Sequence, residues 1–339
     1  MGKLGKQTWQ FRNQPRILAC SAVVGPKEGE GPLKNDFDVI HDEPYVGENS
    51  WEKAEQKLLQ ESIQLAVKKG GVPLSQVDVI LAGDLINQIT VSSFSARSIG
   101  APYLGIFGAC STAMEGLAFA AQLVDAGFAD YAVAATSSHN STAERQFRYP
   151  TEYGGQKPPS AQCTVTGAGA ALVGKGLQGP LITYATIGKV IDMGIKSPWE
   201  MGPAMAPAAV DTITAHFRDT GRTPDDYDLI VTGDLARVGH PIAAELLEAE
   251  GYRMQDKFTD CGMLIFHPDQ PEVFSGGSGC ACCATVTYGY LMRRMAEGKL
   301  NRMLVVATGA LLSPLTVQQG ETIPCIAYAV AIEREGETK

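Results

Sequence analysis

The chain of 339 residues contains no long uninterrupted apolar segment. No stretch approaches the roughly 18 consecutive apolar residues that a membrane-spanning helix requires. The N-terminal residues carry charge but are not followed by an apolar segment, so they do not form a secretory signal. We therefore expect an intracellular protein without a transmembrane helix, which reaches a membrane only as a peripheral component.

Positive charge is also scarce. The chain has 28 Lys and Arg against 37 Asp and Glu, a formal net charge of −9. The basic residues are scattered rather than gathered into runs, whereas contacts to phosphates need clustered Lys and Arg. This pattern excludes nucleic acid as an expected partner.

Motifs for metals and nucleotides are missing as well. The segment "CACC" at residues 280–283 is not a pair of C-x-x-C knuckles, and no histidine lies near it. Without an export signal, we expect the 8 cysteines to be free thiols in apolar surroundings. The glycine runs "TGAGAALVG" and "SGGSGC" lack the G-x-G-x-x-G pattern and indicate close strand–helix packing instead. We expect no metal site and no cofactor.

An internal repeat indicates the architecture. "VDVILAGDLINQ" at residues 77–88 returns as "YDLIVTGDLARV" at 227–238. Residues 108–138 and 279–310 likewise share the order turn, helix, short turn and apolar strand. The repeat predicts an α/β protein of two duplicated halves, 1–180 and 181–339, with an insertion near 139–165 in the first half.

Two of the expected helices are apolar on almost every side. From residue 111 to 126 the strongly polar side chains are Glu115, Gln122 and Asp125, and residues 284–292 carry no charge. A helix of this kind is buried on most sides. We therefore predict a helix layer between two sheets, with more polar helices such as 51–69 outside. The result is a five-layer α-β-α-β-α sandwich.

The segment "GIFGACSTAMEGL" at residues 105–117 places Cys110 between a strand and the first buried helix. A helix N-terminus favours the thiolate form of such a cysteine. Together with the duplicated halves, this corner resembles the thiolase-like family of condensing enzymes. The resemblance implies that Cys110 lines a pocket and, if the chain is an enzyme, that it accepts an acyl group.

The resemblance is incomplete at the catalytic partners. Condensing enzymes of this family add a His with an Asn, or a His with a second Cys. Here the corresponding strand end reads "VTGDLAR", with Gly233 and Asp234, and the later turn reads "GGSGCACC", with Ser278. His240 in "GHP" is the substitute candidate: with Pro241 as the first helical residue, it would lie at a helix N-cap.

Further candidates for ligand binding follow the strand ends. Asp84 and Asp234 are matched by the repeat, and we expect Asp84 to line the pocket and its counterpart to cap a helix. His139 follows another strand end. Arg145 and Arg148 lie in the long connection of the first half, where they could hold carboxylates or form ordinary surface ion pairs.

A closer resemblance is carried by "GKQTW", "ILACSAVVGPKEGEGPL", "GDLINQI" and "GACSTAMEGLA". These segments are similar to a family of sporulation proteins from endospore-forming bacteria. The resemblance implies a homodimer at the forespore or spore inner membrane that works with membrane-embedded sporulation proteins. It implies binding of dipicolinic acid (pyridine-2,6-dicarboxylic acid), free or as its calcium complex, for uptake into the forespore. An acyltransferase that uses Cys110, and a scaffold for membrane-embedded partners, are the alternatives.

Overall fold

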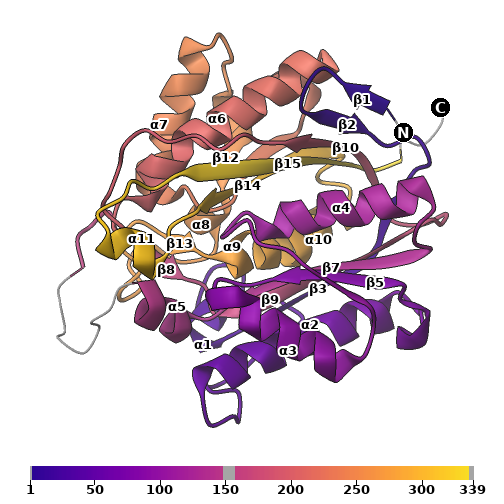
Figure 1. The fold of residues 1–339 in the computed structure, drawn as a ribbon. Coiled ribbons are helices and arrows are strands. Elements are labelled where there is room, and N and C mark those ends of the chain that lie inside the picture. The colour runs from indigo at the N-terminus through magenta and orange to yellow at the C-terminus, as the bar shows by residue number, and fades with distance from the viewer. Residues whose placement is uncertain (1, 148–156, 336–339) are drawn as a thin grey trace.

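A computed structural model describes residues 2–147 and 157–335. Figure 1 shows the layers: helices above, a sheet, central helices, a second sheet, and helices below. The chain is therefore a mixed α/β protein with the five-layer arrangement that the sequence predicts.

The first sheet belongs to the first half of the chain, in the order β6-β5-β7-β9-β3. The strands β5, β6 and β7 are parallel to one another, and β9 is antiparallel to both β7 and β3. Their bounds are β3 Arg16–Val24, β5 Val79–Gly83, β6 Tyr103–Gly105, β7 Tyr131–Ser138 and β9 Gly167–Gly174.

The second sheet repeats that order with the strands of the second half, β12-β11-β14-β15-β10. The directions are repeated too: β11, β12 and β14 are parallel, and β15 is antiparallel to β14 and β10. Their bounds are β10 Leu181–Ile187, β11 Leu229–Thr232, β12 Phe258–Asp260, β14 Arg302–Ala310 and β15 Cys325–Glu333. The same order in both sheets is the structural counterpart of the sequence repeat.

The two sheets meet at a single residue pair, Leu181 of β10 opposite Arg16 of β3. Five short strands add to this framework: β1 and β2 form a hairpin beside β10, β4 extends β3, and β8 pairs with β13. Their bounds are β1 Gly2–Leu4, β2 Thr8–Gln10, β4 Val39–Ile40, β8 Cys163–Thr164 and β13 Gly277–Ser278.

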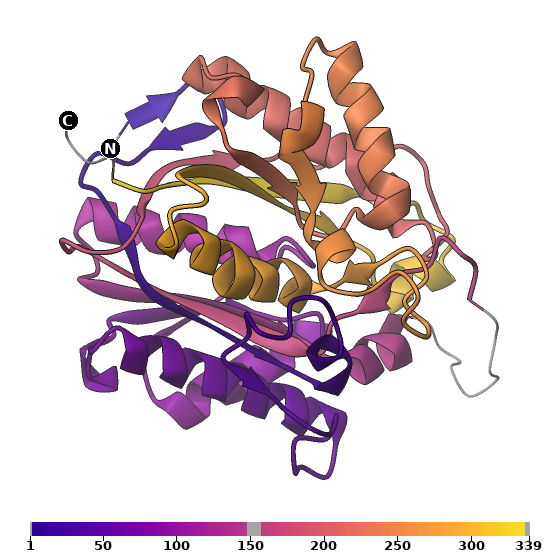
Figure 2. The ribbon, with the colours of Figure 1, turned by 180° about the vertical axis from the view of Figure 1, so that it is seen from behind.

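The central layer consists of two helical segments, which Figure 2 shows from behind. One is α4, Thr112–Ala126. The other is continuous from α9, Cys280–Thr285, through a π-helical turn, Val286–Leu291, to α10, Met292–Ala296. Ten of the fifteen residues of α4 and all six of α9 are buried, in keeping with the apolar sequence.

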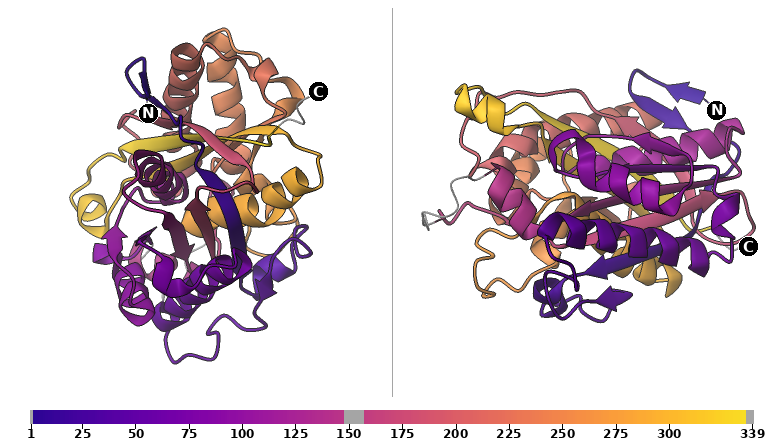
Figure 3. Two further views of the ribbon diagram at one scale, coloured as in Figure 1. Left: turned by 90° about the vertical axis from the view of Figure 1, so that its right-hand side faces the viewer. Right: turned by 60° about the horizontal axis from the view of Figure 1, so that its bottom comes forward.

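Four longer helices cover the outer faces, α2 and α3 on the first sheet and α6 and α7 on the second, as the two views of Figure 3 show. Ser50 caps α2 by accepting a hydrogen bond from the Lys53 N–H. Their bounds are α2 Trp51–Lys69, α3 Thr90–Ile99, α6 Met201–Thr220 and α7 Ala236–Ala249.

Short helices lie in the connections. Their bounds are α1 Pro26–Gly29, α5 Asn140–Phe147, α8 Cys261–Leu264 and α11 Pro314–Gln318, with 3₁₀ turns at Leu74–Gln76, Asn87–Ile89, Pro224–Asp226 and Gln255–Lys257. None of the helices in the described ranges is both long and apolar enough to cross a bilayer.

The glycine run of β9 allows the central layer to approach the first sheet closely. A Cβ on Gly169 would lie 2.7 Å from the Cβ of Ala284 in α9. This contact confirms that the run serves strand–helix packing, as the sequence indicates.

Candidate ligand site at the heads of the central helices

The two central helices begin side by side. Cys110 lies just before α4, in a turn where Ala109 adopts a left-handed φ of 51°. Cys280 is the first residue of α9, and its thiol donates to the carbonyl oxygen of Ala109 at 2.9 Å. This contact joins the heads of the two helices, so the repeat brings equivalent corners of the two halves together.

A narrow cavity of about 40 Å³ opens at this point. That volume is about what one water molecule occupies. The polar lining groups are the Cys110 thiol and the hydroxyls of Thr164 and Ser278. The other lining residues are apolar: Leu85, Phe107, Ala109, Ala143, Phe147, Pro198, Met201, Ala310 and Leu312. No Lys or Arg of the described residues lines the cavity.

Cys110 is the first group in a chain of polar contacts. Its Sγ lies 4.0 Å from the Oγ of Ser278, and that hydroxyl donates to Asp234 Oδ2 at 2.9 Å. Asp234 also accepts from the Gly279 N–H at 3.2 Å and from the Thr308 hydroxyl at 2.6 Å. Asp234 and Ser278 come from the two segments in which the resemblance implies a His and an Asn, and the structure brings these two residues into contact.

The burial and the charges around Cys110 favour the neutral form of its thiol. Burial, followed by the nearby Asp234 carboxylate and Cys280, raises the pKa of Cys110 well above its ordinary value. Burial also raises the pKa of Asp234, against the hydrogen bonds that it accepts. The expectation that the helix N-terminus would favour a thiolate is therefore wrong for this site, because burial and a negative neighbour outweigh the helix dipole.

Asp84 occupies a different place from the one expected. Its carboxylate accepts from the Ile86 N–H at 2.8 Å and from the Ser92 N–H and hydroxyl at 2.7 and 2.6 Å. These bonds fix the connection from β5 into α3, and Asp84 does not line the cavity. The roles of the two repeated aspartates are the reverse of our expectation: Asp234 faces Cys110 through Ser278, and Asp84 is the local cap.

His240 does not line the cavity either. The helix α7 begins at Ala236, so Pro241 lies inside the helix and His240 is not at its N-cap. The imidazole stacks on Phe258 of β12, with ring centroids 4.4 Å apart, and burial lowers its pKa. The helix starts earlier because Ala236 N–H donates to Asp260, a carboxylate that the sequence repeat did not single out.

His139, which is buried, and Arg145, which is exposed, each join elements of the first half. The Ser141 N–H donates to His139 Nδ1 at 3.1 Å, so the proton resides on Nε2, which donates to the Pro44 carbonyl at 2.8 Å. Arg145 pairs with Glu52 of α2 and lies over the Trp51 ring. Neither residue lines the cavity. Arg148, with Tyr149 and Tyr153, lies outside the described residues.

The sequence analysis did not single out Thr164 and Ser278 as cavity residues. It also missed Thr308, whose hydroxyl donates to Asp234. Ser278 had a signal, since it lies in the turn where an Asn was expected. Thr164 and Thr308 had none, because a single threonine at a strand end looks the same whether it faces a cavity or the core.

Solved structures of condensing enzymes share this fold. 3-Oxoacyl-[acyl-carrier-protein] synthase III from Aquifex aeolicus VF5 matches with a TM-score of 0.60 and 12% identity over 94% of this chain and 100% of that one. A variant of OleA from Xanthomonas campestris matches with a TM-score of 0.62 and 14% identity over 95% of this chain and 97% of that one. The duplicated sheets and the Cys110 corner therefore define a thiolase-like fold.

The comparison at the level of sequence is more specific. The family model of stage V sporulation protein AD matches residues 5–333. Stage V sporulation protein AD of Bacillus subtilis (strain 168) is 54% identical over 332 residues, which cover 98% of each chain. The chain belongs to the stage V sporulation protein AD family, so it is a sporulation protein built on a condensing-enzyme fold.

Proposed function

We propose that this protein binds dipicolinic acid, as its calcium chelate, in the cavity at Cys110 and helps its uptake into the forespore. The proposal rests on the row of side-chain contacts that runs from Cys110 through Ser278 to Asp234. This row supplies a hydroxyl and a buried carboxylate from the two segments in which the resemblance implies an Asn and a His. A cavity without the His of condensing enzymes is suited to holding a small molecule rather than to transferring an acyl group.

The charge of the cavity favours the chelate over the free dianion. Burying an unpaired charge costs far more than burying a neutral molecule, and no described lining residue is Lys or Arg. The 1:1 calcium complex of the dianion carries no net charge. Its carboxylate oxygens can accept from the Thr164 hydroxyl, and from the Ser278 hydroxyl once it turns away from Asp234, and the head of α4 adds a partial positive charge.

The ligand is larger than the present cavity, so binding must displace side chains at its mouth. Phe107 is 47% exposed and lines the cavity, and Phe147 and Met201 line it from α5 and α6. Rotation of these side chains opens space without disturbing either sheet. The proposal therefore includes a wider cavity in the bound state.

Calorimetry with an equimolar mixture of calcium and dipicolinate tests the proposal. Saturable binding is expected for the wild type, and loss of a polar lining group in Ser278→Ala or Cys110→Ala should weaken it by about 1–3 kcal/mol. His240→Ala is the matched control, because His240 lies outside the cavity and should leave the affinity unchanged. Absence of saturable heat with the wild type would refute the proposal, and dipicolinate with a calcium chelator measures the free dianion.

Acyl transfer is the less favoured function, because a thiol with a raised pKa is a poor nucleophile. Intact-mass analysis after incubation with acyl thioesters should show no adduct on Cys110. An adduct that turns over with a second substrate would instead establish an enzyme.

Partners and location complete the proposal. We propose a homodimer that lies at the forespore membrane as a peripheral protein and contacts membrane-embedded sporulation proteins. The free edge of the first sheet at β6, where Leu104 is 49% exposed, is the surface proposed for the dimer.

A further inference from the structure

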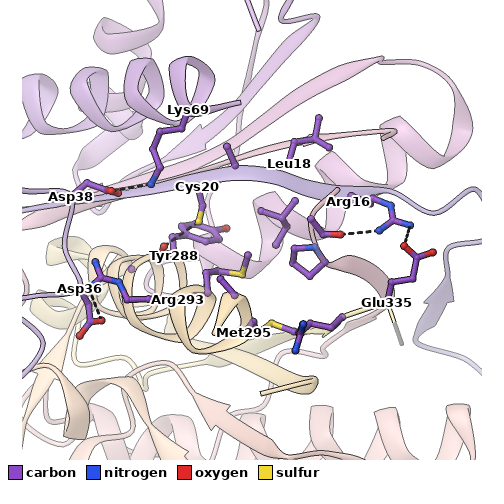
Figure 4. Close-up of a pocket in the computed structure, with 18 of the residues that line it drawn as sticks. Arg16, Leu18, Cys20, Asp36, Asp38, Lys69, Tyr288, Arg293, Met295 and Glu335 are labelled. Carbon is purple, nitrogen blue, oxygen red and sulfur yellow. Dashed lines mark hydrogen bonds and ion pairs between the residues drawn. The ribbon is translucent and has the colours of Figure 1, made fainter. Parts of the chain in front are cut away.

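A second and larger hollow, of about 590 Å³, opens between β3 and the helical segment that ends in α10 (Figure 4). It shares no lining residue with the Cys110 cavity. We propose that this groove binds an extended peptide segment of a partner protein, which adds to β3 as an extra strand. The proposal does not depend on ligand binding at Cys110.

The first wall of the groove is a strand edge left open inside the large sheet. On this side β10 pairs with β3 only at Arg16, and β4 pairs with it only at Val23 and Val24. A backbone hydrogen bond closes each end of this open edge. At one end the Ile17 N–H donates to the Pro180 carbonyl at 3.0 Å, and at the other the Asp38 N–H donates to the Ala22 carbonyl at 2.9 Å. No strand of the described ranges fills the gap between them.

Backbone groups in this gap are directed into the groove. In a strand, residues two apart direct their N–H and C=O groups to the same side. Ala22 bonds Asp38 on the groove side, so the N–H and C=O of Cys20 point the same way. An extended peptide lying beside β3 can accept from this N–H and donate to this carbonyl.

The opposite wall is helical and largely apolar. Tyr288, Met292 and Met295 line it, and Leu18 lines the strand side. A groove between a strand edge and a helix is the geometry in which peptides add to a sheet, since main-chain hydrogen bonds form on one side and side chains pack on the other. Methionine side chains adapt to apolar partners of different shape.

Two buried donors in the groove walls lack partners within the described part of the chain. They are Arg16 Nε and the hydroxyl of Tyr288, and each residue is 3% exposed. Arg16 uses its other nitrogens for the Gly179 carbonyl at 2.8 Å and for Glu335 at 3.0 Å. Both atoms lie beneath the surface of the groove, so an acceptor on a peptide reaches them only when neighbouring side chains move aside.

Ion pairs mark the two ends of the groove, as the dashed lines of Figure 4 show. Arg16 and Glu335 lie at one end and Lys69 and Asp38, 2.9 Å apart, at the other. From Arg16 to Cys20 a strand covers about 13 Å, the length of roughly four extended residues. The groove is lined by four basic residues, Arg16, Lys69, Arg293 and Arg334, and by three acidic ones, Asp36, Asp38 and Glu335. The expected segment is therefore short and mainly apolar, with no large net charge.

Selection from a phage-displayed library of random linear peptides tests the proposal on the full chain. Ala296 lies at an exposed position on α10, and the Ala296→Trp side chain blocks the groove. This variant is added in solution during selection, where it removes the peptides that bind outside the groove. Ala249→Trp, at an exposed position of α7 outside the groove, is the matched control. Enriched peptides are synthesised with a fluorescent label, and their affinities are measured by fluorescence anisotropy.

We expect the selected peptides to bind wild type and Ala249→Trp equally. We expect them to bind Ala296→Trp at least about tenfold more weakly. Hydrogen exchange of the Cys20 amide should slow in the complex, and N-methylation of one central peptide amide should weaken binding by a similar factor. The proposal is overturned if no peptide is enriched, if enriched peptides bind Ala296→Trp as tightly as wild type, or if exchange in residues 17–21 is unchanged.

Discussion

The surroundings of Cys110 decide what this thiol can do. It is 6% exposed, its polar neighbour is Ser278, and the Asp234 carboxylate lies behind that hydroxyl. A condensing enzyme needs a nucleophile that loses its proton readily, and here a negative charge opposes that loss. The same arrangement leaves a neutral thiol in the wall of the cavity, where it can contact a bound small molecule.

Asp234→Asn should therefore make Cys110 more reactive. Removing the negative charge lowers the pKa of the thiol, and each unit of lowering gives about tenfold more thiolate below the pKa. The alkylation rate of Cys110 by iodoacetamide at constant pH, followed by intact mass, measures the change.

Asp256 is an exposed aspartate, and Asp256→Asn is the control because it makes the same change of charge. A Cys110→Ala version of each protein identifies the adduct. Equal rates for Asp234→Asn and wild type would mean that burial alone controls the thiol.

At the scale of elements, the crossing of α6 and α7 positions one wall of the cavity. Met201, which lines the cavity, is the first residue of α6. A Cβ on Gly239 of α7 would lie 2.4 Å from the carbonyl oxygen of Gly202 in α6. The two helices can approach this closely because both positions are glycine.

Gly239→Ala should destabilise the protein by about 1–3 kcal/mol, because the added methyl meets backbone that cannot rotate away. Thermal unfolding of both proteins measures the effect. In Gly176→Ala, the matched control, the methyl meets the end of the Leu18 side chain at 3.1 Å, which can move. A loss in the control as large as in Gly239→Ala would contradict the close-crossing explanation.

At the scale of the whole molecule, buried acids link stability to pH. Burial raises the pKa of Glu28 and Asp260 to about 7, and burial together with Asp84 raises the pKa of Glu55 to about 8. A raised folded-state pKa means that the folded chain holds these protons more tightly than the unfolded chain. Their stabilisation is complete below the ordinary carboxyl pKa and is lost as the pH rises through 7 to 8.

The free energy of unfolding should consequently fall on the order of 2 kcal/mol per pH unit near pH 7. His216, whose pKa burial lowers to about 3, contributes the opposite sign but only below its ordinary value of 6.5. Guanidinium unfolding between pH 6.5 and 8 measures the slope.

Glu55→Gln should flatten the upper part of this profile, because it removes the acid with the highest of the three pKa values. Glu245→Gln, at an exposed position of α7, is the matched control and should keep the wild-type slope. A slope that is the same in Glu55→Gln would show that other groups carry the pH dependence.

The proposed dimer is also a property of the whole molecule. β6 has one strand neighbour, β5, and beside its open edge Leu104 and Phe107 are 49% and 47% exposed. Leu104→Lys should shift light scattering from dimer to monomer, because a charge at a paired strand edge opposes association. Leu177→Lys, 95% exposed elsewhere, should leave the dimer intact. A monomeric wild type would refute the dimer.

The sequence by itself determined the layers. Apolar segments such as residues 111–126 had to be buried on most sides, and the repeated strand–Gly–Asp pattern required two similar halves. These features depend on neighbours along the chain, and the helix α2 lies at residues 51–69, where the sequence predicts it. The position of Cys110 at the head of a buried helix was equally local.

Only the tertiary structure decided which side chains share the site. Asp84 and Asp234 follow the same local pattern, so no local rule tells them apart. The packing of the second half against the head of α4 brings Ser278 to Cys110, with Asp234 behind it, and the start of α7 at Ala236 takes His240 elsewhere. Contacts between residues more than a hundred positions apart carry this information, as does the burial that raises the pKa of the thiol.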